Sequence, residues 1–307
     1  TRSVFSACNG TLCIRTPQHG RTMALDYEKI ISTVETDLPF SYSDKDTILY
    51  ALGVGMGRDP LDSKELPYVY EQGEPLRTLP TLATVLVPEM FPVGLGWDYN
   101  QILHGEQRLK LFRPLPPAAD LLINKRVVDV FDRGEKLGAL FLLEAEGRLA
   151  ADDTALFTMG CTIVARGDGG FGGPKGKGIP PHRTPRREPD LTCDIATRAD
   201  QSLLYRLTGD RNPLHADPAR ARSVGYDRPI LHGLCTFGVA CKAILQTICD
   251  YDYTLIEEFD ARFSAPVIPG DTISTEMWQD GNIVSFSCSV KERDAVVLRN
   301  GKCVLRA

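Results

Sequence analysis

A glycine- and proline-rich segment interrupts the chain near its middle. Residues 167–189 read GDGGFGGPKGKGIPPHRTPRREP, and no apolar period survives in them. Such a composition is typical of a flexible crossover between folded units. The 307-residue chain is therefore expected to hold two units, residues 21–166 and 190–307, joined by the linker 167–189.

The two units share short motifs in the same order, which indicates an internal duplication. Three pairs of segments recur at offsets of 152–155 residues: 46–52 with 201–207, 79–82 with 231–234, and 114–117 with 266–269. One such pair could arise by chance, but three pairs in order are harder to dismiss. We therefore expect one architecture to occur twice.

Each unit predicts a short helix followed by a longer apolar one. The first short helix begins with Ser43 and Asp44, and Thr197 stands three residues before Asp200, a capping-box spacing. The longer helices are expected at 83–91 and 234–249. Segment 234–249 is apolar around nearly its whole circumference, so it should be buried on all sides.

β-like stretches with hairpin turns fill the rest of each unit, which predicts an α+β fold. The expected turns are Asp-Arg-Gly at 132–134, Pro-Gly-Asp at 269–271, Asp-Gly-Asn at 280–282 and Arg-Asn-Gly at 299–301. The expected strands lie at 108–115, 123–131, 136–149, 155–166, 260–267, 271–278, 282–293 and 295–305.

Composition excludes several classes of protein. The net charge is -5 with a pI near 5.6, so no global field favours nucleic acid or an anionic membrane. No run of about 18 apolar residues predicts a membrane span.

Nine cysteines form no CxxC pair, and some, such as Cys241 and Cys249, lie in apolar runs. These thiols are expected to be buried and reduced in an intracellular compartment.

Segment 205–233 concentrates polar groups around a broken helix. Gly209 should end the helix and Pro213 should block its continuation, which leaves Asp210, Asn212 and His215 on an irregular turn. A carboxylate and an imidazole there can share a water molecule and move its proton. By itself, an Asp-x-Asn-Pro turn is more often an Asx turn, and a lone histidine is more often structural.

Downstream, His232 and Gly233 immediately precede the buried helix. The free N–H groups of a helix N-terminus can stabilise an oxyanion, and a glycine lets a carbonyl approach the backbone. His232 itself is expected to be structural. At the 155-residue offset, Asp210 corresponds to Gly55 and Asn212 to Gly57, so only the second unit carries the polar trio.

The motif YRLTGDRNPLH followed by PILHGL resembles the hydratase 2 motif of the MaoC-like hot-dog superfamily. Further similar segments are LHGEQ at 103–107, PLP at 114–116, GGFGG at 169–173, ARF at 261–263 and TEMW at 275–278. The resemblance runs from about residue 41 to residue 307. It implies a double hot-dog fold, with two repeats that each wrap a curved antiparallel sheet around a long helix.

The resemblance also implies a function, the (R)-specific hydration of trans-2-enoyl-CoA in fatty-acid β-oxidation, as in peroxisomal multifunctional enzyme type 2. The second repeat would supply catalysis through Asp210, Asn212, His215 and the Gly233 amide, and Asn212 would orient water or hold the His215 ring. The first repeat would accommodate the acyl chain. Implied substrate contacts are His104, Gly105, Arg133, Arg211, Pro213, Leu214 and Phe263.

These substrate contacts have structural alternatives, because Arg133 would equally suit a solvated turn and Phe263 a packed core. No metal is expected, since the five histidines are scattered without ligand spacing, and no cofactor is expected beyond the CoA of the substrate. We expect a homodimer that is peroxisomal in a eukaryote and cytoplasmic otherwise. Alternative functions are a thioesterase, a hydratase of short branched acyl-CoA, or a non-catalytic acyl-CoA-binding protein.

Overall fold

The computed structural model describes residues 25–72, 74–88, 90 and 101–306. Residues 21–24 of the predicted first unit, and Cys8 and Cys13, lie outside this range. The first half contains these helices and strands: α1 (Tyr27–Ile31), β1 (Val34–Tyr42), α2 (Asp44–Gly53), η1 (Leu66–Tyr68), η2 (Pro80–Val85), β2 (Ile102–Leu111), β3 (Ala119–Asp132), β4 (Ala139–Leu149) and β5 (Ala155–Ala165).

The second half repeats this order of helices and strands and contains one much longer helix. Its elements are β6 (Leu191–Ala196), α3 (Gln201–Tyr205), η4 (Arg206–Thr208), η5 (Pro213–His215), α4 (Pro218–Ser223), α5 (Gly233–Thr247), η6 (Tyr253–Leu255), β7 (Ile256–Phe263), β8 (Thr272–Asp280), β9 (Ile283–Val290) and β10 (Ala295–Leu305). All eight predicted strands are present.

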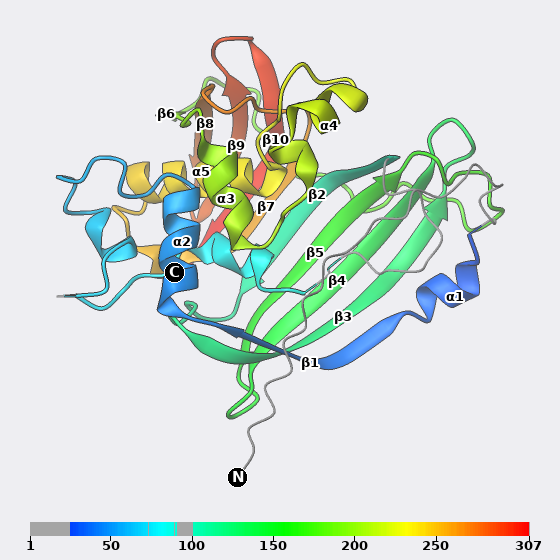
Figure 1. Cartoon of the computed structure of the whole chain (residues 1–307), viewed down its shortest axis with the longest axis horizontal. Coiled ribbons are helices and arrows are strands. Elements are labelled where there is room, and N and C mark those ends of the chain that lie inside the picture. Colours follow the sequence, from blue (N-terminus) through cyan, green and yellow to red (C-terminus); the bar gives the residue numbers. More distant parts are fainter. Residues whose placement is uncertain (1–24, 73, 89, 91–100, 307) are drawn as a thin grey trace.

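The ten strands form one curved antiparallel sheet, in the order β1-β3-β4-β5-β2-β7-β10-β9-β8-β6 (Figure 1). Counted from each edge, the order is β1-β3-β4-β5-β2 and β6-β8-β9-β10-β7, so one five-strand unit occurs twice. β2 and β7 pair at the middle, where Glu106 lies opposite Arg262. The α+β prediction is confirmed. The two strands that the sequence did not predict, β1 and β6, are the edge strands.

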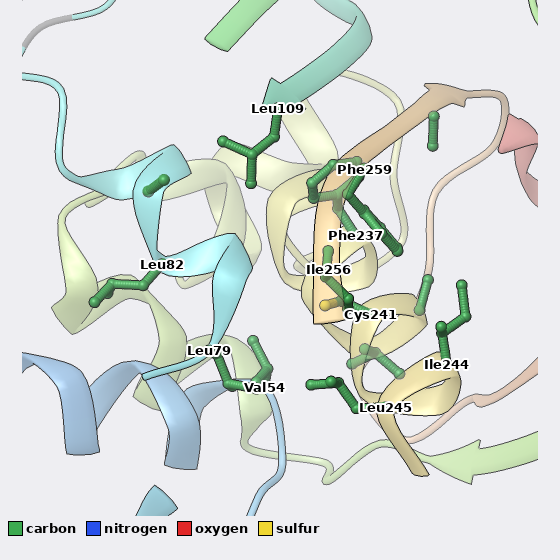
Figure 2. Packing of buried hydrophobic residues seen from close by; sticks show 14 of the residues in the cluster. Val54, Leu79, Leu82, Leu109, Phe237, Cys241, Ile244, Leu245, Ile256 and Phe259 are labelled. Atoms are coloured by element: carbon green, nitrogen blue, oxygen red, sulfur yellow. The ribbon is translucent and has the colours of Figure 1, made fainter. Parts of the chain in front are cut away.

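α5 is buried around its whole circumference, as predicted. Every residue from 235 to 245 is buried. Its side chains pack against β7 and also against first-half residues such as Val54 and Leu109, so both halves share one core (Figure 2). At Gly238 the packing is so close that a Cβ would lie 2.5 Å from Val54. The one charged residue of α5, Lys242, is paired with buried Glu65.

The first half has no counterpart of α5 among its described residues, so the predicted long helix at 83–91 is wrong. The apolar segment instead forms the six-residue 3-10 helix η2, which has Pro80 at its start and ends at Val85. Pro88 lies three residues further on and has no N–H to continue a helix. Residues 89 and 91 lie outside the described part of the chain.

The two short helices begin differently. Ser43 and Asp46 form a reciprocal capping box at α2, so the polar start predicted there is confirmed. The capping box predicted from Thr197 is wrong, because α3 begins after Asp200 and the Thr197 hydroxyl donates to the Asp271 carbonyl. That bond connects the end of β6 to the turn before β8, so the Thr197 hydroxyl does not cap the N–H groups of α3.

The linker is anchored along its length, which corrects the prediction of a flexible crossover. Buried Asp132 accepts hydrogen bonds from the amides of Gly134, Gly170 and Gly172 at 2.8 Å each. The amides of Gly134 and Gly170 hold the pKa of Asp132 well below its usual range. Further along, Arg262 donates to the Ile179 carbonyl. The linker is therefore a strap that joins the β3–β4 turn to the second half.

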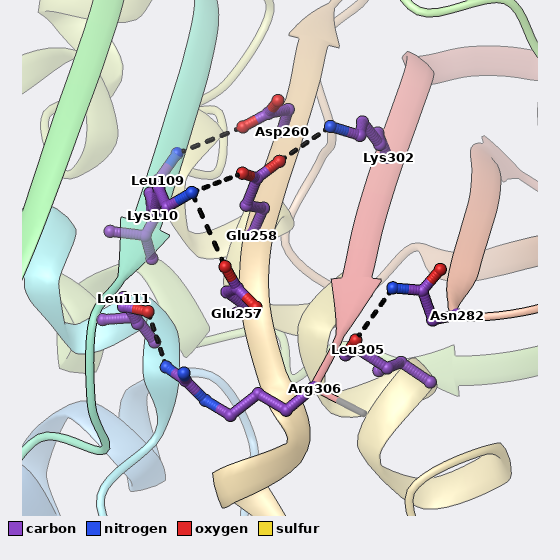
Figure 3. A network of polar contacts seen from close by, with 10 residues as sticks. All are labelled: Leu109, Lys110, Leu111, Glu257, Glu258, Asp260, Asn282, Lys302, Leu305 and Arg306. Carbon is purple, nitrogen blue, oxygen red and sulfur yellow. Dashed lines mark hydrogen bonds and ion pairs between the residues drawn. The ribbon is translucent and has the colours of Figure 1, made fainter.

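Polar pairs also join the halves on the face of the sheet opposite α5 (Figure 3). Lys110 Nζ on β2 lies 3.1 Å from Glu258 Oε1 and 3.5 Å from Glu257 Oε1, both on β7. On β10, Asn300 has a positive φ of 55° within a register shift. The predicted Arg-Asn-Gly hairpin turn is therefore a bulge inside a strand.

Seven of the nine cysteines fall within the described residues, and each is free and buried, as predicted. Burial raises the pKa of Cys161 to about 12, so this thiol stays protonated at neutral pH. Among the described residues, no helix is both long and apolar enough to cross a bilayer.

Candidate active site

The polar turn forms as its sequence predicts. Gly209 ends η4 with a φ of 142°, a conformation that side chains disfavour, and Pro213 begins η5. Asp210 Oδ1 accepts a hydrogen bond from the Asn212 amide at 3.0 Å, while Asn212 Oδ1 accepts one from the Leu214 amide. The Asx-turn interpretation is thus part of the structure. It leaves Asp210 Oδ2 directed toward His215.

His215 is held so that one ring nitrogen keeps its lone pair. Nδ1 lies 2.9 Å from the Ile230 carbonyl oxygen, which can only accept a hydrogen bond. The proton is therefore on Nδ1, and Nε2 is an acceptor. Burial lowers the pKa of His215, against the opposing effects of the Ile230 carbonyl and Asp210. The ring is neutral at pH 7.

The acceptors of His215 and Asp210 have the spacing that a shared water requires. His215 Nε2 lies 3.9 Å from Asp210 Oδ2, too far for a direct hydrogen bond. At ordinary hydrogen-bond lengths, one water that donates to two acceptors holds them roughly 4–4.5 Å apart. The geometry thus suits general acid–base chemistry on a single water molecule.

His232 adds a second imidazole that local spacing did not place in the site. It is the N-cap residue of α5, it is 1% exposed, and its ring stacks on His215 with centroids 3.7 Å apart. Its Nε2 lies 3.1 Å from the main-chain oxygen of Asp210. Burial, and then the neighbouring His215, lower the pKa of His232 to about 4.

Gly233, Phe263 and His104 lie beside the Asp210 turn. Gly233 is the first residue of α5, so its N–H has no acceptor inside the helix. A Cβ at this position would lie 3.1 Å from Phe263 Cε1. The Phe263 ring lies 4.8 Å from the ring of His104 on β2. Burial lowers the pKa of His104 to about 4, against the negative charge of Asp210. Both halves therefore contribute to the site.

The remaining predicted residues have other surroundings. Gly105 forms a bulge in β2, where a Cβ would lie 3.2 Å from the Thr162 carbonyl. Arg133 is exposed in the β3–β4 turn, three strands from β2. Three residues lie on the Asp210 turn itself, with Arg211 and Pro213 exposed and Leu214 half-buried.

One predicted role is wrong, since Asn212 does not hold the ring of His215. The carbonyl oxygen of Ile230 does so, 15 residues further along the chain. Asn212 caps η5 instead, through its bond to the Leu214 amide.

Two of the five histidines converge with Asp210, which their spacing in the sequence did not predict. Ligand atoms of Asp210, His215 and His232 all lie within 4.8 Å of one another. However, the two rings are stacked with an interplanar angle of 26°. Their planes meet roughly 8 Å from the ring centres, whereas an ion bound in both planes would need Zn–N bonds of about 2.1 Å. The arrangement fits a stacked pair better than a chelate.

Two family models match the chain. The model described as MFE-2 hydratase 2 N-terminal domain matches residues 40–167, and the MaoC like domain matches residues 180–300. Enoyl-CoA hydratase ChsH3 of Mycobacterium tuberculosis is 35% identical over 289 residues, 91% of this chain and 98% of that protein. Peroxisomal enoyl-CoA hydratase 2 of Arabidopsis thaliana is 37% identical over 277 residues, 84% of this chain and 89% of that one.

Solved structures agree with these likenesses. A MaoC-like dehydratase from Phytophthora capsici matches with a TM-score of 0.80 and 32% identity, over 91% of this chain and 98% of that one. A Mycobacterium tuberculosis protein described as having a double hot-dog fold shares the fold, with a TM-score of 0.54 and 17% identity over 92% and 98% of the two chains. The protein therefore belongs to the hydratase 2 family of MaoC-like, double hot-dog enzymes.

Proposed function

We propose that this chain is a hydro-lyase that adds water reversibly to trans-2-enoyl-CoA and forms (3R)-3-hydroxyacyl-CoA in fatty-acid β-oxidation. Its family and the enoyl-CoA hydratases among its relatives support this reaction. The observation that carries the catalytic assignment is the 3.9 Å separation of Asp210 Oδ2 and His215 Nε2 beside the N-terminus of α5.

The proposed chemistry uses these two acceptors and one backbone donor. The thioester polarises the C2=C3 bond, water attacks C3, and the π electrons move to the thioester oxygen as an enolate. Asp210 or neutral His215 removes a proton from the water and passes it to C2 on the same face, as the enolate returns to the thioester. The Gly233 amide would stabilise the enolate oxygen, a contribution of about 2.7–4 kcal/mol in other oxyanion holes.

The proposed substrate contacts follow from where the residues lie around Gly233. His104 and Phe263 would flank the acyl thioester next to Gly233, and the exposed Arg211 and Arg133 would meet the phosphates of CoA. Gly105, Pro213 and Leu214 would shape the walls. The first half would accommodate the acyl chain, which the short η2 supports, since it occupies less space than a helix of the length of α5.

This reaction needs no cofactor, because CoA is part of the substrate. By similarity to relatives such as the peroxisomal plant enzyme, we propose a peroxisomal location in a eukaryotic host and a cytoplasmic one otherwise. We also propose a homodimer. Sedimentation at micromolar concentration tests the assembly, and a monomer there would contradict it.

Product analysis tests the reaction. The purified chain is incubated with trans-2-enoyl-CoA thioesters of several chain lengths, and the loss of conjugated absorbance, the release of free CoA and the chirality of the product are measured. Hydration to the (3R) alcohol without free CoA is expected. Release of free CoA would favour a thioesterase, and binding without turnover would favour a non-catalytic acyl-CoA-binding protein.

Matched variants test the assigned residues. Asp210→Asn and His215→Gln are expected to lower kcat by several orders of magnitude. Asp152→Asn is the carboxylate control, because Asp152 Oδ1 also accepts the amide two residues ahead but lies in an exposed turn. His182→Gln is the imidazole control, because that ring binds Ser285. Near-wild-type turnover in either site variant would refute the assignment.

A further inference from the structure

The proposed reaction needs Asp210, His215 and Gly233 in one arrangement, and a single side chain touches or adjoins all three. We infer that His232 is a positioning residue, which holds the Asp210 main chain and the His215 ring in register with the Gly233 amide. This inference rests on the proposed function for its effect on rate, while its geometry can be tested without substrate.

The first link is a hydrogen bond to the backbone of the catalytic turn. His232 Nε2 lies 3.1 Å from the main-chain oxygen of Asp210, which can only accept, so Nε2 carries the proton. The Asp210 side chain is 49% exposed, and its own Oδ1 is bonded within the turn to the Asn212 amide. The His232 bond therefore ties an otherwise exposed turn to the buried N-cap residue of α5.

The second link is the stack on His215. The Nδ1–H···O bond to Ile230 fixes one edge of the His215 ring, and the stacked ring of His232 covers its face at 3.7 Å. Tyr205 packs on His232 in turn, with ring centroids 5.0 Å apart. Together these contacts leave Nε2 of His215 directed toward Asp210.

The third observation explains why a histidine occupies this position. His232 Nδ1 is buried and has no hydrogen-bond partner, and leaving such an atom unpaired is costly. A phenylalanine would stack without that cost, and an asparagine would donate a hydrogen bond without the ring. Only histidine among these three residues supplies the Nε2–H donor and the stacking face together.

Kinetics of two complementary variants test the inference. His232→Phe keeps a ring but loses the donor, and His232→Asn keeps a donor but loses the ring. We expect kcat to fall by about 10²-fold in each, the cost of displacing reacting groups by roughly 1 Å. KM should stay close to that of wild type, because the contacts of His232 are with Asp210, His215 and Tyr205 and not with the proposed substrate contacts. His182→Phe and His182→Asn, the same two substitutions at a ring that lies against Ser285, serve as the matched controls.

A purely structural role predicts a different pattern. It would lower the midpoint of urea unfolding in proportion to the loss of rate, and a temperature low enough to keep the variants folded would restore kcat. We expect kcat to stay low under those conditions. A kcat within twofold of wild type in both folded variants would overturn the inference.

Ring tautomers separate this inference from the proposed function. Long-range ¹H–¹⁵N NMR of the substrate-free protein should show the proton of His232 on Nε2 and that of His215 on Nδ1. The geometry is wrong if either ring shows the other tautomer. If the tautomers are as expected but no enoyl-CoA is hydrated, the proposed function fails while the positioning geometry stands.

Discussion

Replacing Lys242 with methionine is expected to lower the free energy of unfolding by about 3–5 kcal/mol, as breaking a buried ion pair from one side does in other proteins. The Lys242 and Glu65 side chains are each 6% exposed, and Nζ lies 2.6 Å from Oε1. Lys242 Nζ also donates to the Gly55 carbonyl at 2.6 Å. Methionine is about as long as the aliphatic part of lysine. The change in the free energy of unfolding therefore measures the contribution of the charge and its hydrogen bonds.

The magnitude follows from the groups that would be left behind. The Gly55 carbonyl loses its buried donor, a cost of about 1–3 kcal/mol. The Glu65 carboxylate loses its cation and retains the Gly57 amide at 2.7 Å and the Tyr251 hydroxyl at 3.3 Å. The free energy of unfolding of an ordinary domain is about 5–15 kcal/mol, so the expected loss is a large part of it.

Urea denaturation at pH 7 measures this loss, and the chain offers a matched control. Lys64 and Asp250 form an ion pair of similar length, but their side chains are 59% and 81% exposed. Lys64→Met should cost at most about 1 kcal/mol. If Lys242→Met cost no more than Lys64→Met, the reasoning about burial would be refuted.

Three further results are expected. Because burial lowers the pKa of His215 and the neutral ring is the acceptor, kcat/KM should fall on acidification with a midpoint below pH 6.5; a midpoint above 6.5 would contradict this. Gly233→Val should lower kcat/KM at least tenfold, because its side chain meets Phe263, and Phe263→Ala should relieve part of that loss. Asp132→Ala should expose residues 167–180 to limited proteolysis, since three amides lose their acceptor; wild-type resistance would sink this idea.

Strands and turns were predictable because alternating burial and turn residues are local signals. The eight predicted strands carry these signals, whereas the edge strand β1 contains Pro39 and a register shift between Glu35 and Leu38. The error at 83–91 has a similar origin, because apolar composition indicates burial without specifying a helix. The order of the strands depends on pairings more than 100 residues apart, such as β2 with β7, which no local pattern encodes.

The residues of the site also fall into those that local sequence could predict and those that it could not. Asp210 and His215 lie five residues apart on one turn, so the sequence could place them together. The bond from His232 to the Asp210 carbonyl spans 22 residues, and the contact of His104 with Phe263 joins the two halves. Neither has a local signature. The one available signal for His232 was its position immediately before Gly233 and the buried helix.

The strap across residues 167–189 has a consequence for how this enzyme can be divided. Val54, Leu109 and Phe237 belong to a single cluster, so each half alone would lack one wall of its interior. A gene cut within the strap would thus encode two fragments that are incomplete separately. We expect each fragment to be insoluble when it is produced alone. When the two fragments are produced together, we expect them to associate and form the complete ten-stranded sheet.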